Sequence, residues 1–200
     1  MISTSNCMRK KRVAWAMTQA QFHGNHQGEF AMTAIRFTAM PTIDAEHLWK
    51  GGCDAYDRLP DTMVSDGPGH PCRHCLENID EGEELLVFAY RPFPALQPYA
   101  ETGPIFLHKR PCTRYAAEEI LPPVLMTSPD FILRGYNEDN RIVYGTGAVT
   151  LIGEIATYGE RLLARPDVAY VHVRSARNNC FQCRIDKIKA PALTETGAFA

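Results

Sequence analysis

Two short pairs of metal-ligating residues, separated by 32 residues, constrain this chain more than any other feature of its sequence. Cys72 and Cys75 have C-x2-C spacing, and a tight backbone turn between two such cysteines lets both thiolates hold one ion. His108 and Cys112 follow with H-x3-C spacing. Three sulfurs and one imidazole nitrogen form a tetrahedral set that zinc accepts, with Zn–S near ~2.3 Å and Zn–N near ~2.0 Å. The sequence therefore predicts one zinc site that clamps a loop.

Two alternatives remain open for these residues. The cysteines can be small buried apolar side chains, with His108 a core or surface histidine. His70 and His74 lie nearby and are substitute ligands if His108 points elsewhere. Four protein ligands leave no coordination position for water, so the expected role is structural. Three cysteines and a water would instead give a catalytic zinc with an open position.

Composition limits the protein class. The chain has 200 residues, of which 45% are apolar and 22% charged, as in ordinary globular proteins. Its formal net charge of −2 does not favour binding to nucleic acid or acidic membranes. No apolar run approaches the ~18 residues that span a bilayer. Seven cysteines, an odd number, argue against a disulfide framework, and no secretion signal is evident. We therefore expect a cytoplasmic protein.

The N-terminal 31 residues differ in composition from the rest of the chain. They are rich in Gln, Asn, His, Ser and Met and show no persistent periodicity, so residues 1–31 are expected to be a disordered leader. Met32 is an alternative translation start, which would place the leader upstream of the native protein. Residues 32–190 are expected to form a single domain, and residues 191–200 a disordered tail.

The hydrophobic pattern of residues 32–190 predicts an α+β fold, mostly antiparallel sheet with one main helix and short helices. The main helix is expected at 149–164, where the apolar residues fall near one stripe and Pro166 follows. Short helices are expected at 44–56 and 115–121, and 61–71 is expected to be a loop. The expected strands are 34–37, 85–90, 104–108, 131–136, 142–144, 169–175 and 181–188.

A second C-x2-C, Cys180 to Cys183, lies in an expected strand. Positions i and i+3 of a strand point to opposite faces, so this pair is not expected to hold one ion. Cys183 is expected in the core, on the same face as Phe181 and Ile185. Cys180 is expected near the surface, where its thiol could act as a nucleophile with His172 as its base. The alternative is an inert thiol at the start of a strand.

The preceding strand alternates polar and apolar residues. Tyr170, His172 and Arg174 share one face, which converges on the turn at 177–179. Guanidinium groups bind carboxylate or phosphate through paired hydrogen bonds, so this face predicts a site for a small anion. The alternative is an ordinary solvated sheet face. The expected ligand-binding residues are His172, Arg174, Asn178, Cys180 and Arg184.

These observations favour a binding module over an enzyme. The zinc-stapled domain is expected to bind a small anionic ligand or a macromolecular partner. The alternative is an enzyme that uses Cys180 with His172, or a catalytic zinc. The nucleophile elbow G-x-S-x-G, the zinc-protease motif H-E-x-x-H and the dinucleotide fingerprint G-x-G-x-x-G are all missing from the sequence.

Several short sequence motifs, taken together, resemble those of a known family. Across residues 33–188 the chain is similar to the family catalogued as domain of unknown function 1203, found in bacterial proteins. That resemblance implies no activity. The family's general pattern lacks the second cysteine and the H-x3-C, which implies that the zinc site belongs to a subset of members. The motifs are Pro71-Cys72-Arg73, Gly82-Glu83-Glu84, Gly103-Pro104-Ile105-Phe106, Ala169-Tyr170-Val171-His172-Val173, Ala176-Arg177 and Cys180-Phe181.

Overall fold

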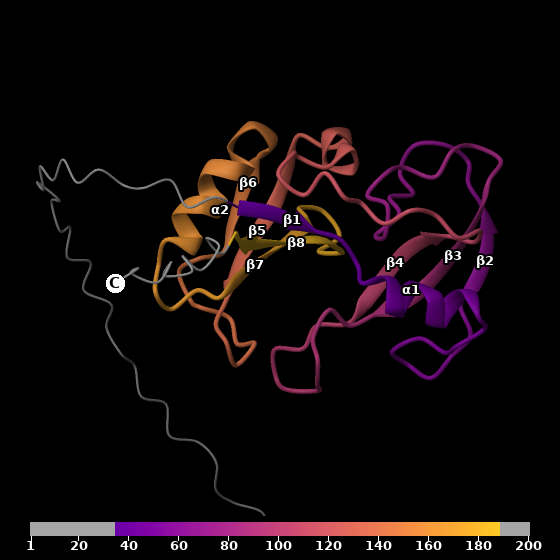
Figure 1. Ribbon diagram of the computed structural model, residues 1–200, viewed down its shortest axis with the longest axis horizontal. Coiled ribbons are helices and arrows are strands. Elements are labelled where there is room, and N and C mark those ends of the chain that lie inside the picture. The colour runs from indigo at the N-terminus through magenta and orange to yellow at the C-terminus, as the bar shows by residue number, and fades with distance from the viewer. Residues whose placement is uncertain (1–34, 189–200) are drawn as a thin grey trace, which may run out of the picture. The chain divides into compact units, whose positions relative to one another are not determined.

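Figure 1 shows a computed structural model of the chain, which describes residues 35–188. Two antiparallel sheets and two short α-helices make up most of this part, which confirms the predicted α+β class. The predicted leader (1–31) and tail (191–200) lie outside the described residues. In chain order the elements are β1 (Ile35–Thr38), α1 (Thr42–Trp49), β2 (Asp61–Val64), β3 (Glu84–Tyr90), β4 (Gly103–His108), η1 (Pro123–Thr127), β5 (Asp130–Tyr136), β6 (Ala148–Leu151), η2 (Ile152–Glu154), α2 (Ile155–Leu163), β7 (Tyr170–Ser175) and β8 (Phe181–Lys187).

The larger sheet has five strands in the order β1-β8-β7-β5-β6. Its central strand β7 is buried on both faces. The valines and the tyrosine of this strand favour such a buried position in a sheet. One face carries Val171, Val173, Cys183 and Ile185, which pack with α2 in the main core. Gly159 brings α2 close to the sheet, since an added Cβ there would lie 3.1 Å from Ile185 Cδ1. Figure 1 shows α2 covering this sheet.

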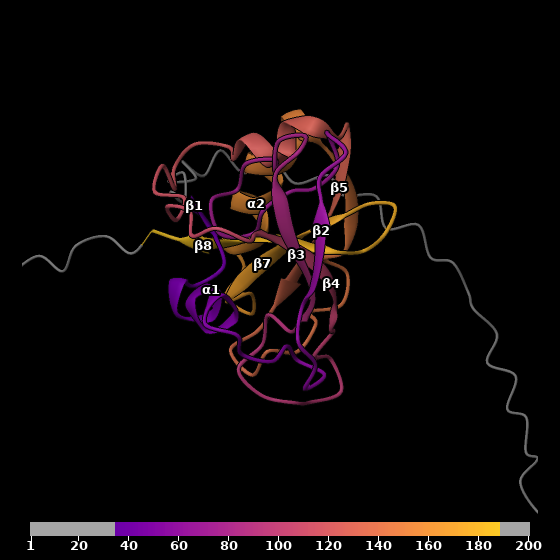
Figure 2. The ribbon, with the colours of Figure 1, turned by 90° about the vertical axis from the view of Figure 1, so that its right-hand side faces the viewer.

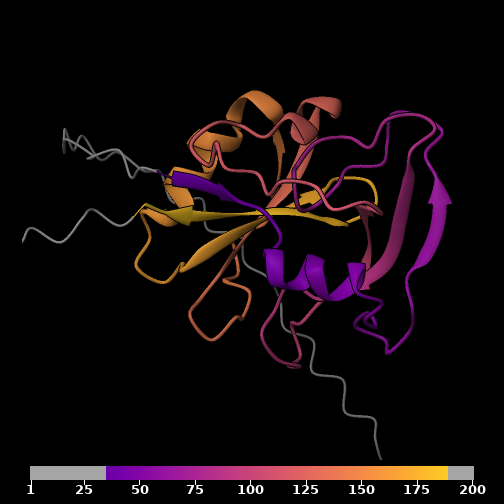
Figure 3. The same cartoon turned by 45° about the vertical axis from the view of Figure 1, so that its right-hand side comes forward.

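The smaller sheet has three strands in the order β2-β3-β4. Figure 2 shows it in front of the five-stranded sheet, and Figure 3 shows α1 next to it. Ala45 and Leu48 of α1 pack with residues of β3 and β4 in a second, smaller core. The helix begins after Pro41 and ends at Trp49. Gly51, with φ +84°, then provides the left-handed conformation that closes many helices.

The predicted main helix at 149–164 is wrong in its first half. Residues 148–151 form β6, which pairs with β5, and the α-helix begins only at Ile155. Val149 and Thr150 are β-branched and favour a strand once a partner edge is present. The apolar periodicity therefore predicted α2 correctly, but the predicted helix began six residues before Ile155.

Four other local predictions also differ from the structure. The expected helix at 44–56 begins at Thr42 and ends at Trp49. The expected helix at 115–121 is absent, because Tyr115 N–H donates to His74 O and Glu118 O accepts from Phe37 N–H instead of bonding within a helix. The expected loop at 61–71 contains β2, an exposed edge strand without the apolar alternation that identifies strands. The expected strand at 142–144 is reduced to one bridge between Tyr136 and Ile142. The chain turns at 137–140, between β5 and this bridge.

Among residues 35–188, no helix is both long enough and apolar enough to cross a membrane.

Candidate functional site

The C-x2-C pair lies in a tight knuckle between β2 and β3. Cys72 N–H donates to Glu77 O at 2.9 Å, and Leu76 N–H donates to Cys72 O at 3.0 Å. Leu76 adopts φ +55°, a left-handed conformation that is unusual for a bulky residue. Its fully buried side chain packs in the main core, while Cys72 packs in the smaller core. The knuckle therefore anchors both cores while it turns the two thiols toward one point.

Strand β4 supplies the other two candidate ligands. His108 is the last residue of β4, and Cys112 follows in the segment that leaves the strand. A parallel bridge pairs Cys72 with Phe106, and Arg73 N–H donates to Phe106 O at 3.1 Å. These backbone contacts hold the knuckle against β4, which brings residues far apart in sequence to one site.

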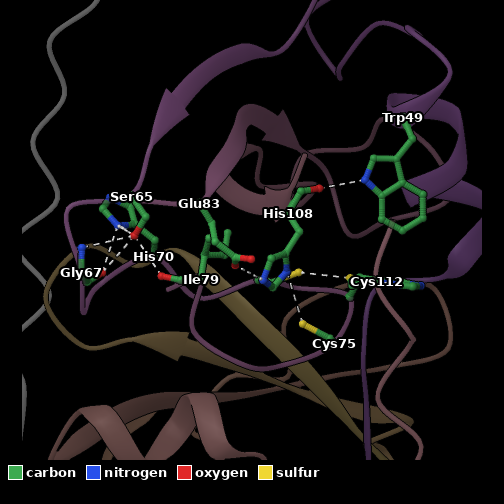
Figure 4. A network of polar contacts seen from close by, with 11 residues as sticks. Trp49, Ser65, Gly67, His70, Cys75, Ile79, Glu83, His108 and Cys112 are labelled. Atoms are coloured by element: carbon green, nitrogen blue, oxygen red, sulfur yellow. Dashed lines mark hydrogen bonds and ion pairs between the residues drawn. The ribbon is translucent and has the colours of Figure 1, made fainter. Parts of the chain in front are cut away.

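The structure brings all four predicted metal ligands together. The ligand atoms of Cys72, Cys75, His108 and Cys112 lie within 4.8 Å of one another. Cys72 Sγ and Cys112 Sγ are 3.8 Å apart, and Cys75 Sγ is 3.6 Å from His108 Nδ1 (Figure 4). The edges of a tetrahedron with zinc-like bond lengths are about 3.8 Å for S–S and about 3.5 Å for S–N. The four side chains thus form a compact group that could hold one metal ion, and the two distances given fit tetrahedral zinc.

Neighbouring polar groups orient the imidazole of His108. Its Nε2 lies 3.5 Å from Glu83 Oε2, so a carboxylate faces the nitrogen opposite the ligand atom. The indole N–H of Trp49 donates to His108 O at 2.8 Å and fixes the backbone there (Figure 4). A carboxylate behind a ligating histidine is the usual support of protein metal sites.

The two substitute histidines take other roles. His74 Nδ1 lies 3.3 Å from Cys112 Sγ, and its Nε2 lies 3.0 Å from Thr42 Oγ1. His74 can therefore support Cys112 from outside the ligand set. His70 contacts Ser65 Oγ at 3.2 Å and packs on the ring of Phe106. Neither substitute is needed, because His108 faces the cysteines.

The site favours a thiolate at Cys72 and a charged imidazole at His108, whereas hydrogen bonds with Cys72 and Cys75 raise the pKa of Cys112 and keep that thiol neutral. Hydrogen bonds with Cys112 and Cys75 lower the pKa of Cys72. The sulfurs of Cys72 and Cys75 raise the pKa of His108 to about 10. A metal ion that binds Nδ1 must displace this proton, so metal binding at neutral pH releases protons.

Arg73, between the two knuckle cysteines, is a buried cation. It is 1% exposed, its Nε–H donates to Phe181 O at 2.7 Å, and its Nη1 donates to Pro71 O. Burial lowers its pKa to about 10, while the nearby sulfurs of Cys180, Cys72 and Cys183 oppose that shift. No carboxylate pairs with it within residues 35–188. A divalent ion with three thiolates carries a net charge of −1, which this guanidinium can balance.

The predicted polar face exists but is neither an open patch nor a solvated surface. Tyr170, His172 and Arg174 share one face of β7, opposite Tyr136, Arg134 and Ile132 of β5. They are only 3%, 1% and 3% exposed. The segment between β3 and β4, with Phe93 and Glu101, lies against this face. The alternative of a solvated sheet face is therefore wrong, because a loop covers the face, while the anion site stays a prediction.

Arg174 pairs with a half-buried acidic residue, Glu101, that the sequence analysis missed. Glu101 accepts from Arg174 at 2.8 Å, from Arg134 at 2.7 Å and from the hydroxyl of Tyr136 at 3.0 Å. Burial opposes ionisation of Glu101, but the two arginines outweigh it and hold its pKa below the ordinary value. Arg174 also donates to Asn179 O at 2.8 Å. No local pattern marks Glu101, which lies in a Pro-rich connection.

The remaining predicted ligand-binding residues divide into two groups. His172 and Arg184 are register partners on β7 and β8 and both line a cleft of about 750 Å³. Asn178 and Cys180 lie in the β7–β8 turn, where Cys180 Sγ contacts Asn178 O at 3.7 Å. Cys180 does not line the cleft, and no hydrogen bond joins it to His172 in the described part of the chain. The geometry therefore does not assemble the expected nucleophile and base.

The prediction that Cys183 is a core residue is confirmed, but its grouping with Phe181 is wrong. Cys183 is fully buried and opposes Val173, whereas Phe181 opposes Arg174. The register shift between these pairs is a β-bulge, which inserts one residue into β8. Side chains on the two sides of the bulge therefore no longer follow the alternation of a regular strand. Phe181 therefore lies on the His172 face, with ring centroids 4.9 Å apart.

Comparison with known proteins gives one match. Residues 69–187, which include all four candidate metal ligands, match the family described as Protein of unknown function (DUF1203). No curated protein matches the chain. No solved structure matches it either.

Proposed function

The chain belongs to this DUF1203 family, whose description assigns no activity, and we propose that it is a binding domain built around a structural zinc ion. The zinc holds the knuckle, β4 and the segment after β4 together. The cleft between the two sheets receives a small anionic ligand. The observation that carries this proposal is the ligand tetrahedron, whose edges of 3.8 Å and 3.6 Å fit zinc.

The composition of the ligand set favours zinc over other metals and a structural over a catalytic role. Three sulfurs and one nitrogen in tetrahedral arrangement suit zinc, whereas magnesium and calcium prefer oxygen ligands. Four protein ligands close the coordination shell. The core around the site is small, with ten buried apolar residues, and small cores gain much from a metal staple.

The thiol state of the chain supports a reducing compartment. All six cysteines of the described part are free, including the exposed Cys53. Free thiols persist in the cytoplasm, where glutathione keeps them reduced. A cytoplasmic location is accordingly part of the proposal.

Metal analysis tests the zinc site directly. We expect purified wild-type protein to contain one zinc per chain by elemental mass spectrometry, and Cys72→Ser and Cys112→Ser to lose it. Cys53→Ser is the matched control, because Cys53 is a free thiol outside the cluster, and it should keep its zinc. A metal-free wild type, or equal loss in all three variants, contradicts the site.

An acetate titration tests the binding role. Acetate, a minimal carboxylate, should shift the amide NMR signals of cleft residues such as His172 and Arg184 while those of α2 stay in place. Sodium chloride at the same ionic strength is the control. Identical shifts with both salts would exclude a specific anion site.

A further inference from the structure

The cleft of about 750 Å³ has the size of a small-molecule site. One wall comes from the five-stranded sheet, with Arg36 of β1, His172 of β7 and Phe181 of β8. The other wall comes from α1 and from the end of β3 with the segment that follows it, including Arg91. Residues far apart in the sequence thus form one enclosure, and its unpaired groups indicate what it binds.

Every carboxylate that lines the cleft already has partners. Asp44 accepts from the Tyr90 hydroxyl at 3.1 Å. Asp54 accepts from three backbone amides at 2.8 to 3.1 Å. Asp186 accepts from Arg184 at 2.6 Å and from the Thr38 hydroxyl at 2.7 Å. Each carboxylate thus has its hydrogen-bond donors, and Asp186 alone of the three forms an ion pair among residues 35–188.

One cation in the cleft lacks a partner. Arg184 pairs with Asp186 and lies over the ring of Tyr170 at 3.9 Å. Arg36 has Glu118 at 3.8 Å. Arg91 forms no ion pair among residues 35–188, and its Nε is buried without a hydrogen-bond partner. Because buried polar groups are almost always hydrogen-bonded, Arg91 points to an acceptor that the described chain does not supply.

A second unpaired group lies on the opposite wall of the cleft. His172 is 1% exposed, and its Nδ1 has no hydrogen-bond partner. Its ring is enclosed by those of Phe93 at 5.1 Å and Phe181 at 4.9 Å. Both phenylalanines also line the cleft, together with Tyr90. Flat aromatic walls of this kind favour a flat or apolar body over a strongly hydrated one.

We propose that this cleft binds a small carboxylic acid with a flat apolar body, the carboxylate on Arg91 and the body against the cleft-lining side of Phe93, Phe181 and Tyr90. The inference rests on the proposed binding role and names the ligand class. A guanidinium presents a planar pair of donors that matches a carboxylate. Phosphate is less suitable, because its second charge and additional oxygens would need donors that the aromatic walls lack.

Titrations of the full-length zinc-loaded protein with four probes test the ligand class. By amide NMR shifts, we expect benzoate to bind about tenfold more tightly than acetate, because its ring buries apolar area in the cleft. Benzamide keeps the ring but not the charge and should bind at least about tenfold more weakly than benzoate. Inorganic phosphate should also bind more weakly than benzoate.

The charge of Arg91 is tested by substitution. Arg91→Met keeps most of the side-chain length and should weaken benzoate binding about tenfold. Arg161→Met, on α2 and outside the cleft, is the matched control and should bind as wild type does. If Arg91→Met does not fold, the comparison of benzoate with benzamide on wild type still decides whether the carboxylate charge matters.

The outcomes separate this inference from the proposed function. Equal affinity for benzoate and acetate, or tighter binding of phosphate, overturns the flat apolar body and leaves the anion site intact. Equal affinity for benzoate and benzamide, or undiminished benzoate binding by a folded Arg91→Met, overturns the role of Arg91. No specific response to any probe overturns both the ligand class and the binding role, while the zinc content still tests the metal site.

Discussion

At the residue scale, Glu83 shows how a surface side chain can serve a metal site. It comes from the Gly-containing turn before β3, and its Oε2 lies 3.5 Å from His108 Nε2. A carboxylate in this position fixes the tautomer of the imidazole and increases its basicity. Trp49 holds the backbone of the same histidine from the other side.

Glu83→Gln should weaken zinc binding about tenfold, at the lower end of the range for such partners because Glu83 is half exposed. The measurement is a competition between the protein and a chromophoric chelator. Glu81→Gln is the control, since Glu81 lies in the same turn but does not contact His108. Equal affinity for wild type and Glu83→Gln would show that Glu83 does not support the ligand.

At the element scale, the structure depends on segments that cross between the two sheets. The knuckle reaches β8 through Arg73, whose guanidinium donates to Phe181 O at 2.7 Å. The connection between β3 and β4 reaches β5 and β7 through Glu101. Both crossings use arginine hydrogen bonds in buried surroundings, where such bonds are strong and costly to break.

The Glu101 crossing should make the fold sensitive to acid. The folded-state pKa of Glu101 lies below its ordinary value of 4.5, so the unfolded chain binds its proton at a higher pH than the folded chain does. The stabilisation is therefore complete above about pH 4.5 and is lost as the pH falls through the folded-state pKa.

The prediction is that Glu101→Gln removes this part of the acid dependence. The free energy of unfolding, measured by urea denaturation between about pH 3 and pH 6, should fall less steeply on the acid side than for wild type. Glu138→Gln, in the exposed turn at 137–140, is the control and should keep the wild-type slope. Parallel curves for wild type and Glu101→Gln would refute the assignment.

At the scale of the whole molecule, the metal centre and the cleft lie on different parts of one framework. The three cysteines of the candidate metal site pack in the smaller core with β3 and β4, and α1 joins this core to one wall of the cleft. The larger core, around α2 and the five-stranded sheet, has its own buried residues. Loss of the metal should therefore loosen the smaller core first.

Chelation tests this expectation. In a Trp15→Phe background, Trp49 is the single tryptophan and reports on His108, to whose carbonyl it donates. Removal of zinc should shift the Trp49 emission to longer wavelength and lower the Tm by more than about 10 °C. Added zinc should restore both values, and magnesium should not. Unchanged emission and Tm in a demonstrably zinc-free sample would rule out a structural role.

The sequence by itself determined the parts of this protein that depend on local spacing. The C-x2-C and H-x3-C spacings identified all four members of the metal cluster, because chelation imposes short fixed separations. Apolar runs predicted β3 and β4, and apolar alternation predicted β7 and β8, each to within a residue or two. Family membership likewise followed from short motifs in the chain.

The tertiary structure alone decided which polar residues are available to a ligand. Arg174 and Arg91 look alike in sequence, but Glu101 pairs with the first and no described residue pairs with the second. Because of the bulge on β8, Phe181 lies on the His172 face, although the alternation of a regular strand predicts the opposite face. The ion-pair partners of an arginine and the walls of a cleft come from segments that are distant in the chain. Local sequence patterns therefore do not predict them. The spacing of the residues thus predicted the Cys3His cluster, whereas the cleft depends on two sheets and a loop that come together around His172.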